Sequence, residues 1–153
     1  MTDDGVRDEG TETTALREAL AAEHAAVWGY GTVGAALTAG SRPQVSAAEN
    51  AHRDVRDRLA ELLQQRGDDP VPAEAGYALP FPVLSAVDAA ALAVVLEDGV
   101  AAAWVRVLDQ AVQSTVRRMA VDELAGAEVR AVGWRGAAVR TPVTTPFPGL
   151  PQG

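Results

Sequence analysis

The residues best suited to chemistry in this sequence are four glutamates and one histidine. Glu23, Glu97 and Glu123 fall on or near apolar stripes with helical spacing, and Glu49 with His52 forms a Glu-x-x-His pair. Carboxylates and imidazoles that point into a helical bundle hold di-iron and di-manganese centres, because these cations prefer oxygen ligands and a histidine completes each metal. These five residues therefore define one hypothesis, a metal-dependent oxidoreductase with iron or manganese as its cofactor.

Two observations count against that metal site. No glutamate of the last apolar stripe has a histidine three residues later, so the second Glu-x-x-His pair of such centres is missing. The expected positions of these residues along the bundle axis also disagree with a shared metal site. With a turn centred near Arg42, Glu23 lies level with Glu61, which is on the order of 10–18 Å along the axis from Glu49 and His52. The sequence therefore favours a protein with no metal cofactor.

A structural role suits the same acids better. Buried carboxylates are costly unless they are paired, so Glu23, His52 and Glu97 are expected in a buried set of hydrogen bonds or ion pairs that links helices. An arginine such as Arg106 or Arg130 is a candidate donor to this set. A set of this kind fixes the register of the helices and does no chemistry.

The elements that must position these residues are helices. Apolar residues recur at steps of three and four, which predicts helices over about 14–38, 44–66, 85–110 and 115–139. Gly40 is expected to end the first helix, and Ser85 to cap the third, which is apolar on nearly every side. Residues 1–13 are expected to form a disordered acidic tail, and the Pro-rich residues 140–153 an extended one.

The connections predict the topology. Short turns join the first two helices and the last two, so each pair forms an antiparallel hairpin. Residues 67–84 contain four prolines and could extend to about 60 Å, whereas a helix of about 23 residues is roughly 35 Å long. We therefore predict an all-α, ferritin-like four-helix bundle with one long crossover.

Composition excludes several functional classes. The net charge of -8 disfavours binding to nucleic acid or to a membrane surface, and all 13 basic residues are arginine. The chain contains no cysteine, so thiol chemistry and disulfides are excluded. The first residues lack the pattern of a secretory signal, which predicts a cytoplasmic protein.

Three glycines within the first helix suggest a second use of the core. Gly29, Gly31 and Gly34 cost about 1 kcal/mol each relative to alanine, so close helix packing or a local bend should offset them. The alternative is room for a small ligand near Tyr30 and Trp104. A small-ligand carrier is therefore a further hypothesis.

Several segments together resemble a known family. They are ALREALAAEHAAVWGYG (15–31), AENAHR (48–53), YALPFPV (77–83), LEDGVAAAW (96–104) and PFPGLP (146–151). This order is similar to that of actinobacterial, alanine-rich, ferritin-like proteins classed as a domain of unknown function. The resemblance implies a ferritin-like bundle and a dimer, and its matched polar positions are Glu23, His24, Glu49, His52, Glu97 and Asp98.

The sequence thus favours a protein that is not an enzyme. We expect it to act through self-association as a homodimer or through a protein partner, and its two Pro-Phe-Pro segments could contact the bundle or a neighbour. The side chains expected to be buried and polar, or to border a ligand space, are His24, Tyr30, Asp98 and Trp104.

Overall fold

The computed structural model describes residues 8–151, and it confirms the predicted all-α bundle. Its elements are α1 (Glu9–Ala36), the short 3-10 helix η1 (Ala39–Ser41), α2 (Arg42–Gln65), α3 (Ala86–Gln110) and α4 (Ser114–Ala137). No strand occurs among these residues. None of the helices in this part of the chain combines the length and apolarity that a membrane span requires.

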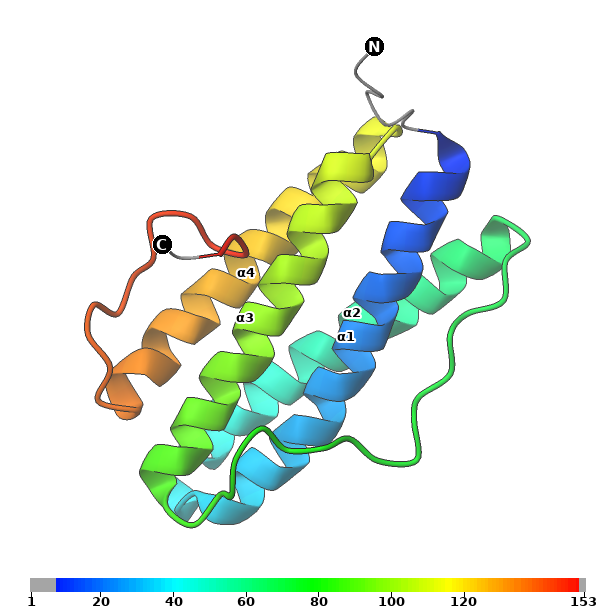
Figure 1. Cartoon of the computed structure of the whole chain (residues 1–153). Coiled ribbons are helices and arrows are strands. Elements are labelled where there is room, and N and C mark those ends of the chain that lie inside the picture. The colour runs from blue at the N-terminus through cyan, green and yellow to red at the C-terminus, as the bar shows by residue number, and fades with distance from the viewer. Residues whose placement is uncertain (1–7, 152–153) are drawn as a thin grey trace.

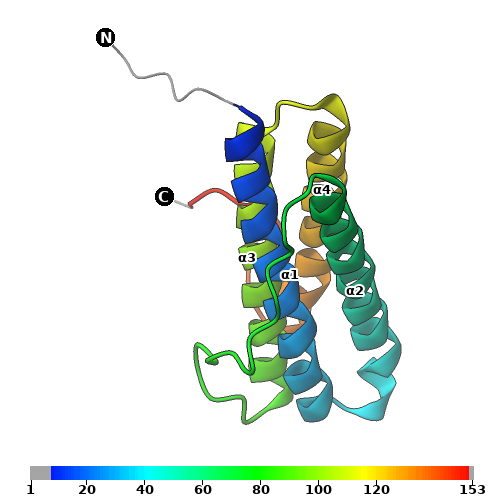
Figure 2. The same cartoon turned by 90° about the vertical axis from the view of Figure 1, so that its right-hand side faces the viewer.

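The four helices form two antiparallel hairpins joined by one long crossover (Figure 1). α1 packs along α2 and α3, and α3 packs along α4. The connection between α2 and α3 runs the length of the bundle beside α1, so that α2 and α3 point the same way (Figure 2). Side chains of α1 hold this connection: Arg17 pairs with Asp68 at 2.7 Å, and the rings of Trp28 and Tyr77 lie 5.7 Å apart.

The first helix begins earlier than predicted. Residues 9–13 are helical, although they were expected in the acidic tail. Asp8 caps the helix by accepting a hydrogen bond from the backbone N–H of Thr11 at 2.8 Å, and the Thr11 hydroxyl accepts one from the backbone N–H of Asp8. The remainder of the predicted tail, residues 1–7, lies outside the described residues, as do residues 152–153 of the predicted C-terminal tail.

The apolar core consists of two clusters, one toward each end of the bundle. One cluster includes Leu16, Leu59 and Trp104, and the other includes Val33, Leu92 and Trp134. On α2, the residues up to Ala48 belong to the second cluster and those from Val55 onward to the first. His52 lies between them, so polar side chains cross the middle of the core.

The glycines of α1 have different surroundings. A Cβ at Gly29 would lie 2.6 Å from a methyl group of Leu96 on α3, and one at Gly34 would lie 3.2 Å from Val45 on α2. These two glycines allow helices to approach closely, as predicted. A Cβ at Gly31 would meet nothing within 4 Å.

We therefore expect Gly31→Ala to stabilise the protein by up to about 1 kcal/mol, because alanine restricts the unfolded chain without a clash in the fold. Urea denaturation would measure the change. Gly29→Ala is the matched control and should gain less or lose stability, since Leu96 must move. A loss of stability in Gly31→Ala would contradict this account.

The C-terminal segment, residues 138–151, contains neither helix nor strand and lies against α3 and α4. Arg135 of α4 is buried, and it donates hydrogen bonds to Glu128 at 2.8 Å and to the carbonyl oxygen of Val143 at 3.0 Å. Gly149 has a φ of +79°, and a Cβ there would lie 2.6 Å from the carbonyl oxygen of Ala101. Only glycine suits such a backbone so close to α3.

Candidate functional site in the bundle core

Side chains from all four helices form one hydrogen-bonded group in the middle of the core. We call it the buried polar network, and its members are Glu23 and Tyr30 of α1, His52 of α2, Glu97 and Trp104 of α3, and Arg130 and Trp134 of α4. All members except Arg130 are buried, and the Arg130 side chain is 21% exposed. The network lies where the two apolar clusters meet.

One carboxylate oxygen joins the four helices. Glu97 Oε1 accepts hydrogen bonds from the Tyr30 hydroxyl at 2.5 Å, from His52 Nε2 at 3.1 Å and from Arg130 Nε at 2.9 Å. These donors come from α1, α2 and α4, whereas Glu97 belongs to α3. The other oxygen, Oε2, is buried and has no partner among the described residues.

His52 lies between two carboxylates. Its Nδ1 donates to Glu23 Oε2 at 2.7 Å, and its Nε2 donates to Glu97. Burial alone would lower the pKa of His52, but the hydrogen bonds to Glu23 and Glu97 outweigh it and raise the pKa to about 9. The ring is therefore a cation near neutral pH, and it uses both nitrogens to bind acids.

The charges of the network balance. Burial favours a raised pKa for Glu97, yet the hydrogen bond and charge of His52 and the nearby guanidinium of Arg130 lower that pKa overall. Burial likewise opposes the charge of Arg130, and Glu97 more than compensates by raising the Arg130 pKa. Two carboxylates thus face two cations, which is the condition under which buried charges are tolerated.

The contacts between α1 and α3 are reciprocal. Tyr30 of α1 donates to Glu97 of α3, and Trp104 Nε1 of α3 donates to Glu23 Oε1 of α1 at 3.0 Å. In each helix the aromatic donor follows the glutamate by seven residues, which is about two turns. Because α1 and α3 are antiparallel, this equal spacing brings each donor level with the opposite acid.

The phenol of Tyr30 is fixed as a donor. Burial and the neighbouring charge of Glu97 both raise the Tyr30 pKa above its usual value, so the hydroxyl keeps its proton. Trp134 Nε1 donates to the same hydroxyl oxygen at 2.8 Å. The two rings lie 6.1 Å apart between their centres.

The predicted buried set of hydrogen bonds and ion pairs is present, but the heights of its members differ from the prediction. Glu23, His52 and Glu97 meet, and Arg130 is the arginine that joins them; Arg106 instead pairs with Glu18 at the surface at 2.9 Å. The expectation that Glu23 and His52 lie at different heights is wrong. The connection between α1 and α2, residues 37–41, is centred at Ala39, which places Glu23 only about three residues, or roughly 4.5 Å, from the level of His52.

The other two predicted metal ligands lie outside this network. Glu49 pairs with Arg53 of its own helix at 2.5 Å, and Glu123 pairs with Arg58 across the seam between α2 and α4. Among residues 8–151 no group of three or more His, Asp or Glu side chains could hold a metal ion. The five predicted ligands therefore do not converge on one point.

The four buried-polar or ligand-space candidates divide into two pairs. Tyr30 and Trp104 belong to the buried polar network. His24 is half-buried and donates to the carbonyl oxygen of Val71 in the crossover at 3.0 Å. Asp98 is exposed and pairs with Arg135 at 2.7 Å, so its predicted burial is wrong. It follows Glu97 by one residue and therefore points about 100° away from Glu97 around the axis of α3.

The glycine-lined space differs from the predicted one. A groove of about 210 Å³ lies between α1 and α2, and Tyr30, Gly31 and Gly34 line it together with residues of α2. Trp104 does not line this groove, because it is fully buried in the other apolar cluster. The groove is therefore not the ligand space expected near Tyr30 and Trp104.

One buried acid escaped the sequence interpretation. Glu12 is fully buried, and it accepts hydrogen bonds from Arg66 at 2.5 Å and from the backbone N–H groups of Val112 and Gln113. Although burial opposes its charge, these donors lower the Glu12 pKa overall. Its position four residues before Leu16, on the same stripe, was a signal that could have identified it.

Comparisons with known proteins place the chain in a family without assigning an activity. The model of a family described as a domain of unknown function, DUF4439, matches residues 15–152. A crystal structure of a conserved hypothetical protein, rv2844, from Mycobacterium tuberculosis is similar, with a TM-score of 0.82 and 39% sequence identity over 84% of this chain and 98% of that chain. No curated protein matches. The chain therefore belongs to the DUF4439 family.

Proposed function

We propose that this protein is a non-catalytic, ferritin-like bundle that acts by association with a second copy or with a protein partner. The observation that carries the proposal is the saturation of Glu97 Oε1 by donors from three other helices. A carboxylate oxygen with three donors is committed to holding the helices together. The protein then serves as a stable scaffold, and its surface binds the second copy or the protein partner.

The metal-dependent alternative fits these residues poorly. A histidine that ligates a metal uses a neutral ring nitrogen, whereas both ring nitrogens of His52 donate to carboxylates. Glu23 and Glu97 lie on opposite edges of that ring, so they cannot share an ion with it. The guanidinium of Arg130 already supplies positive charge beside Glu97.

The test is the metal content of the protein. We expect wild-type protein, purified after growth with added iron or manganese, to contain far less than one ion per chain, because its buried acids already have donors. Inductively coupled plasma mass spectrometry would measure both metals. Glu97→Ala and the surface variant Glu49→Ala should give the same low values.

About two ions per chain, lost in Glu97→Ala and kept in Glu49→Ala, would overturn the non-catalytic assignment. That pattern would mean that the buried polar network rearranges around metal.

A further inference from the structure

One side of α4 is exposed in the described part of the chain, residues 8–151. α4 packs against α3, Glu123 faces α2, and Glu128 holds the C-terminal segment through the N–H of Thr145. Between these contacts lies what we call the α4 face, formed by Arg118, Val121, Asp122, Ala125 and Val129, which occupy about 100° of the helix circumference. All five are exposed, with Val121 at 49% and Val129 at 73%.

The two charged residues of this face, Arg118 and Asp122, are unpaired among the described residues. The side chains of Arg118 and Asp122 have no hydrogen bond or ion pair with any of residues 8–151. They lie one helical turn apart and carry opposite signs. If a second α4 packs antiparallel about a two-fold axis near Ala120, Arg118 of each copy faces Asp122 of the other, which gives two equivalent ion pairs.

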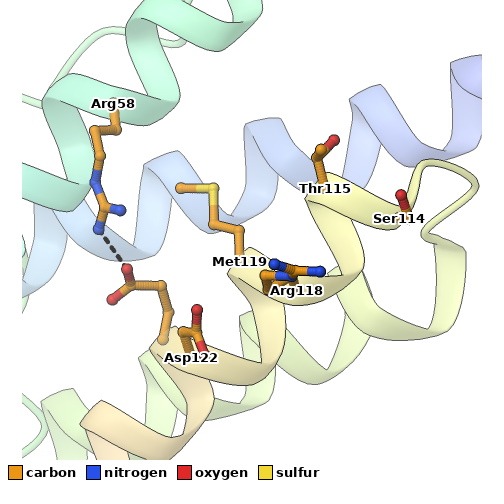
Figure 3. A pocket seen from close by; sticks show the side chains of 7 residues that line it. Arg58, Ser114, Thr115, Arg118, Met119 and Asp122 are labelled. Atoms are coloured by element: carbon orange, nitrogen blue, oxygen red, sulfur yellow. Dashed lines mark hydrogen bonds and ion pairs between the residues drawn. The ribbon is translucent and has the colours of Figure 1, made fainter.

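A hollow beside the α4 face offers space for the second copy. It measures about 390 Å³, lies between α2 and α4, and is lined by residues that include Arg58, Thr115 and Met119 (Figure 3). In the antiparallel arrangement Val121 of the second copy lies level with Met119, and its Ala125 lies level with Thr115. The small side chain of Ala125 lets the two helices approach closely.

The overall charge of the protein also favours this face. Two copies that each carry a net charge of -8 repel one another at most orientations. The α4 face holds one positive and one negative side chain among three apolar ones, so it is neutral and self-complementary. Contact there removes Val121 from water without bringing like charges together.

We propose that the α4 face is the interface of a homodimer, in which the α4 helices of two copies pack antiparallel about an axis near Ala120. This inference rests on the proposed function, since it names the partner in the association as a second copy. The arrangement is isologous: each copy contributes the same patch, and each ion pair occurs twice.

Charge reversal tests the proposal. Arg118→Asp and Asp122→Arg, each alone, place like charges opposite one another at both pairs, so each should weaken the dimer about tenfold or more. Mixing the two variants restores opposite charges at both pairs and should recover a dimer with an affinity within a few-fold of wild type. Sedimentation velocity over a range of concentrations measures the dimer affinity of the wild type, of each variant and of the mixture. Thermal denaturation confirms that these exposed substitutions leave the fold intact.

Arg42→Asp is the matched control, because Arg42 is an exposed arginine of α2, outside the α4 face, and its reversal should leave the dimer unchanged. A wild-type protein that stays monomeric at about 100 µM, or a dimer insensitive to both reversals, would overturn the proposal. A monomer whose α4 face binds a different protein would also overturn it. None of these results alters the metal content, so this failure is distinguishable from failure of the proposed function.

Discussion

Replacement of Glu97 by alanine is expected to lower the free energy of unfolding by about 3–5 kcal/mol. The substitution leaves two cations, His52 and Arg130, with one carboxylate in the core, and it removes the acceptor of the Tyr30 hydroxyl. An uncompensated buried charge costs more than the lost hydrogen bonds alone. Urea denaturation followed by circular dichroism would measure the loss.

Asp98→Ala is the matched control, because Asp98 is the next residue and its side chain is 53% exposed. Its ion pair with Arg135 is exposed on the Asp98 side, and Arg135 keeps Glu128 as a partner, so the loss should be about 1 kcal/mol. Should Glu97→Ala fail to fold, Glu97→Gln keeps the size of the side chain and still removes the charge. If neither Glu97 variant costs more than Asp98→Ala, the buried polar network does not stabilise the fold.

Stability should fall as the pH rises from neutral to alkaline values. The pKa of His52 is raised from 6.5 to about 9 in the folded protein, so the folded state binds this proton more tightly than the unfolded state. The resulting stabilisation is fully present below about pH 6.5 and is lost as the pH rises through about 9. A shift of this size corresponds to about 3 kcal/mol. Denaturation midpoints measured across this pH range would test it.

The pH dependence should disappear in His52→Gln and persist in His24→Gln. His24 is the matched control, since it is the other histidine of the chain and lies half-buried against the crossover. Neutral His52 has one proton fewer, so it can donate to Glu23 or to Glu97 but not to both. A wild-type protein with constant stability across this range would show that His52 is not held as a cation.

The fold was predictable because its signals are local and repeated. Apart from the start of α1, helical periodicity predicts the helix boundaries to within two residues. Ser85 caps α3 as expected, by accepting a hydrogen bond from the backbone N–H of Asp88 at 3.1 Å. The start of α1 was missed because its cap is Asp8, within a stretch of polar residues that resembles a tail. Glu12 lies on the same stripe as Leu16, but its partners, the backbone N–H groups of Val112 and Gln113, are tertiary contacts that no local pattern reports.

The site was predictable in its residue types and less so in its partners. The positions of glutamates on apolar stripes identified Glu23 and Glu97. The predicted height of Glu23 was wrong, because moving the turn by three residues moves the α2 residue that lies level with Glu23 by six. Glu49 shares a side of α2 with His52, yet Arg53 pairs with it at the surface. A side chain of this length can turn inward or outward, and its neighbours decide which.

The reciprocal contacts between α1 and α3 show that the two halves of the chain contribute the same types of group to the core. Each half brings to the core one glutamate, one aromatic donor seven residues later and one cation on its second helix, namely His52 or Arg130. The contacts therefore do not depend on which hairpin comes first along the chain. A circularly permuted protein, with α3 and α4 preceding α1 and α2, would bring the same groups together if a linker of similar length spanned the bundle.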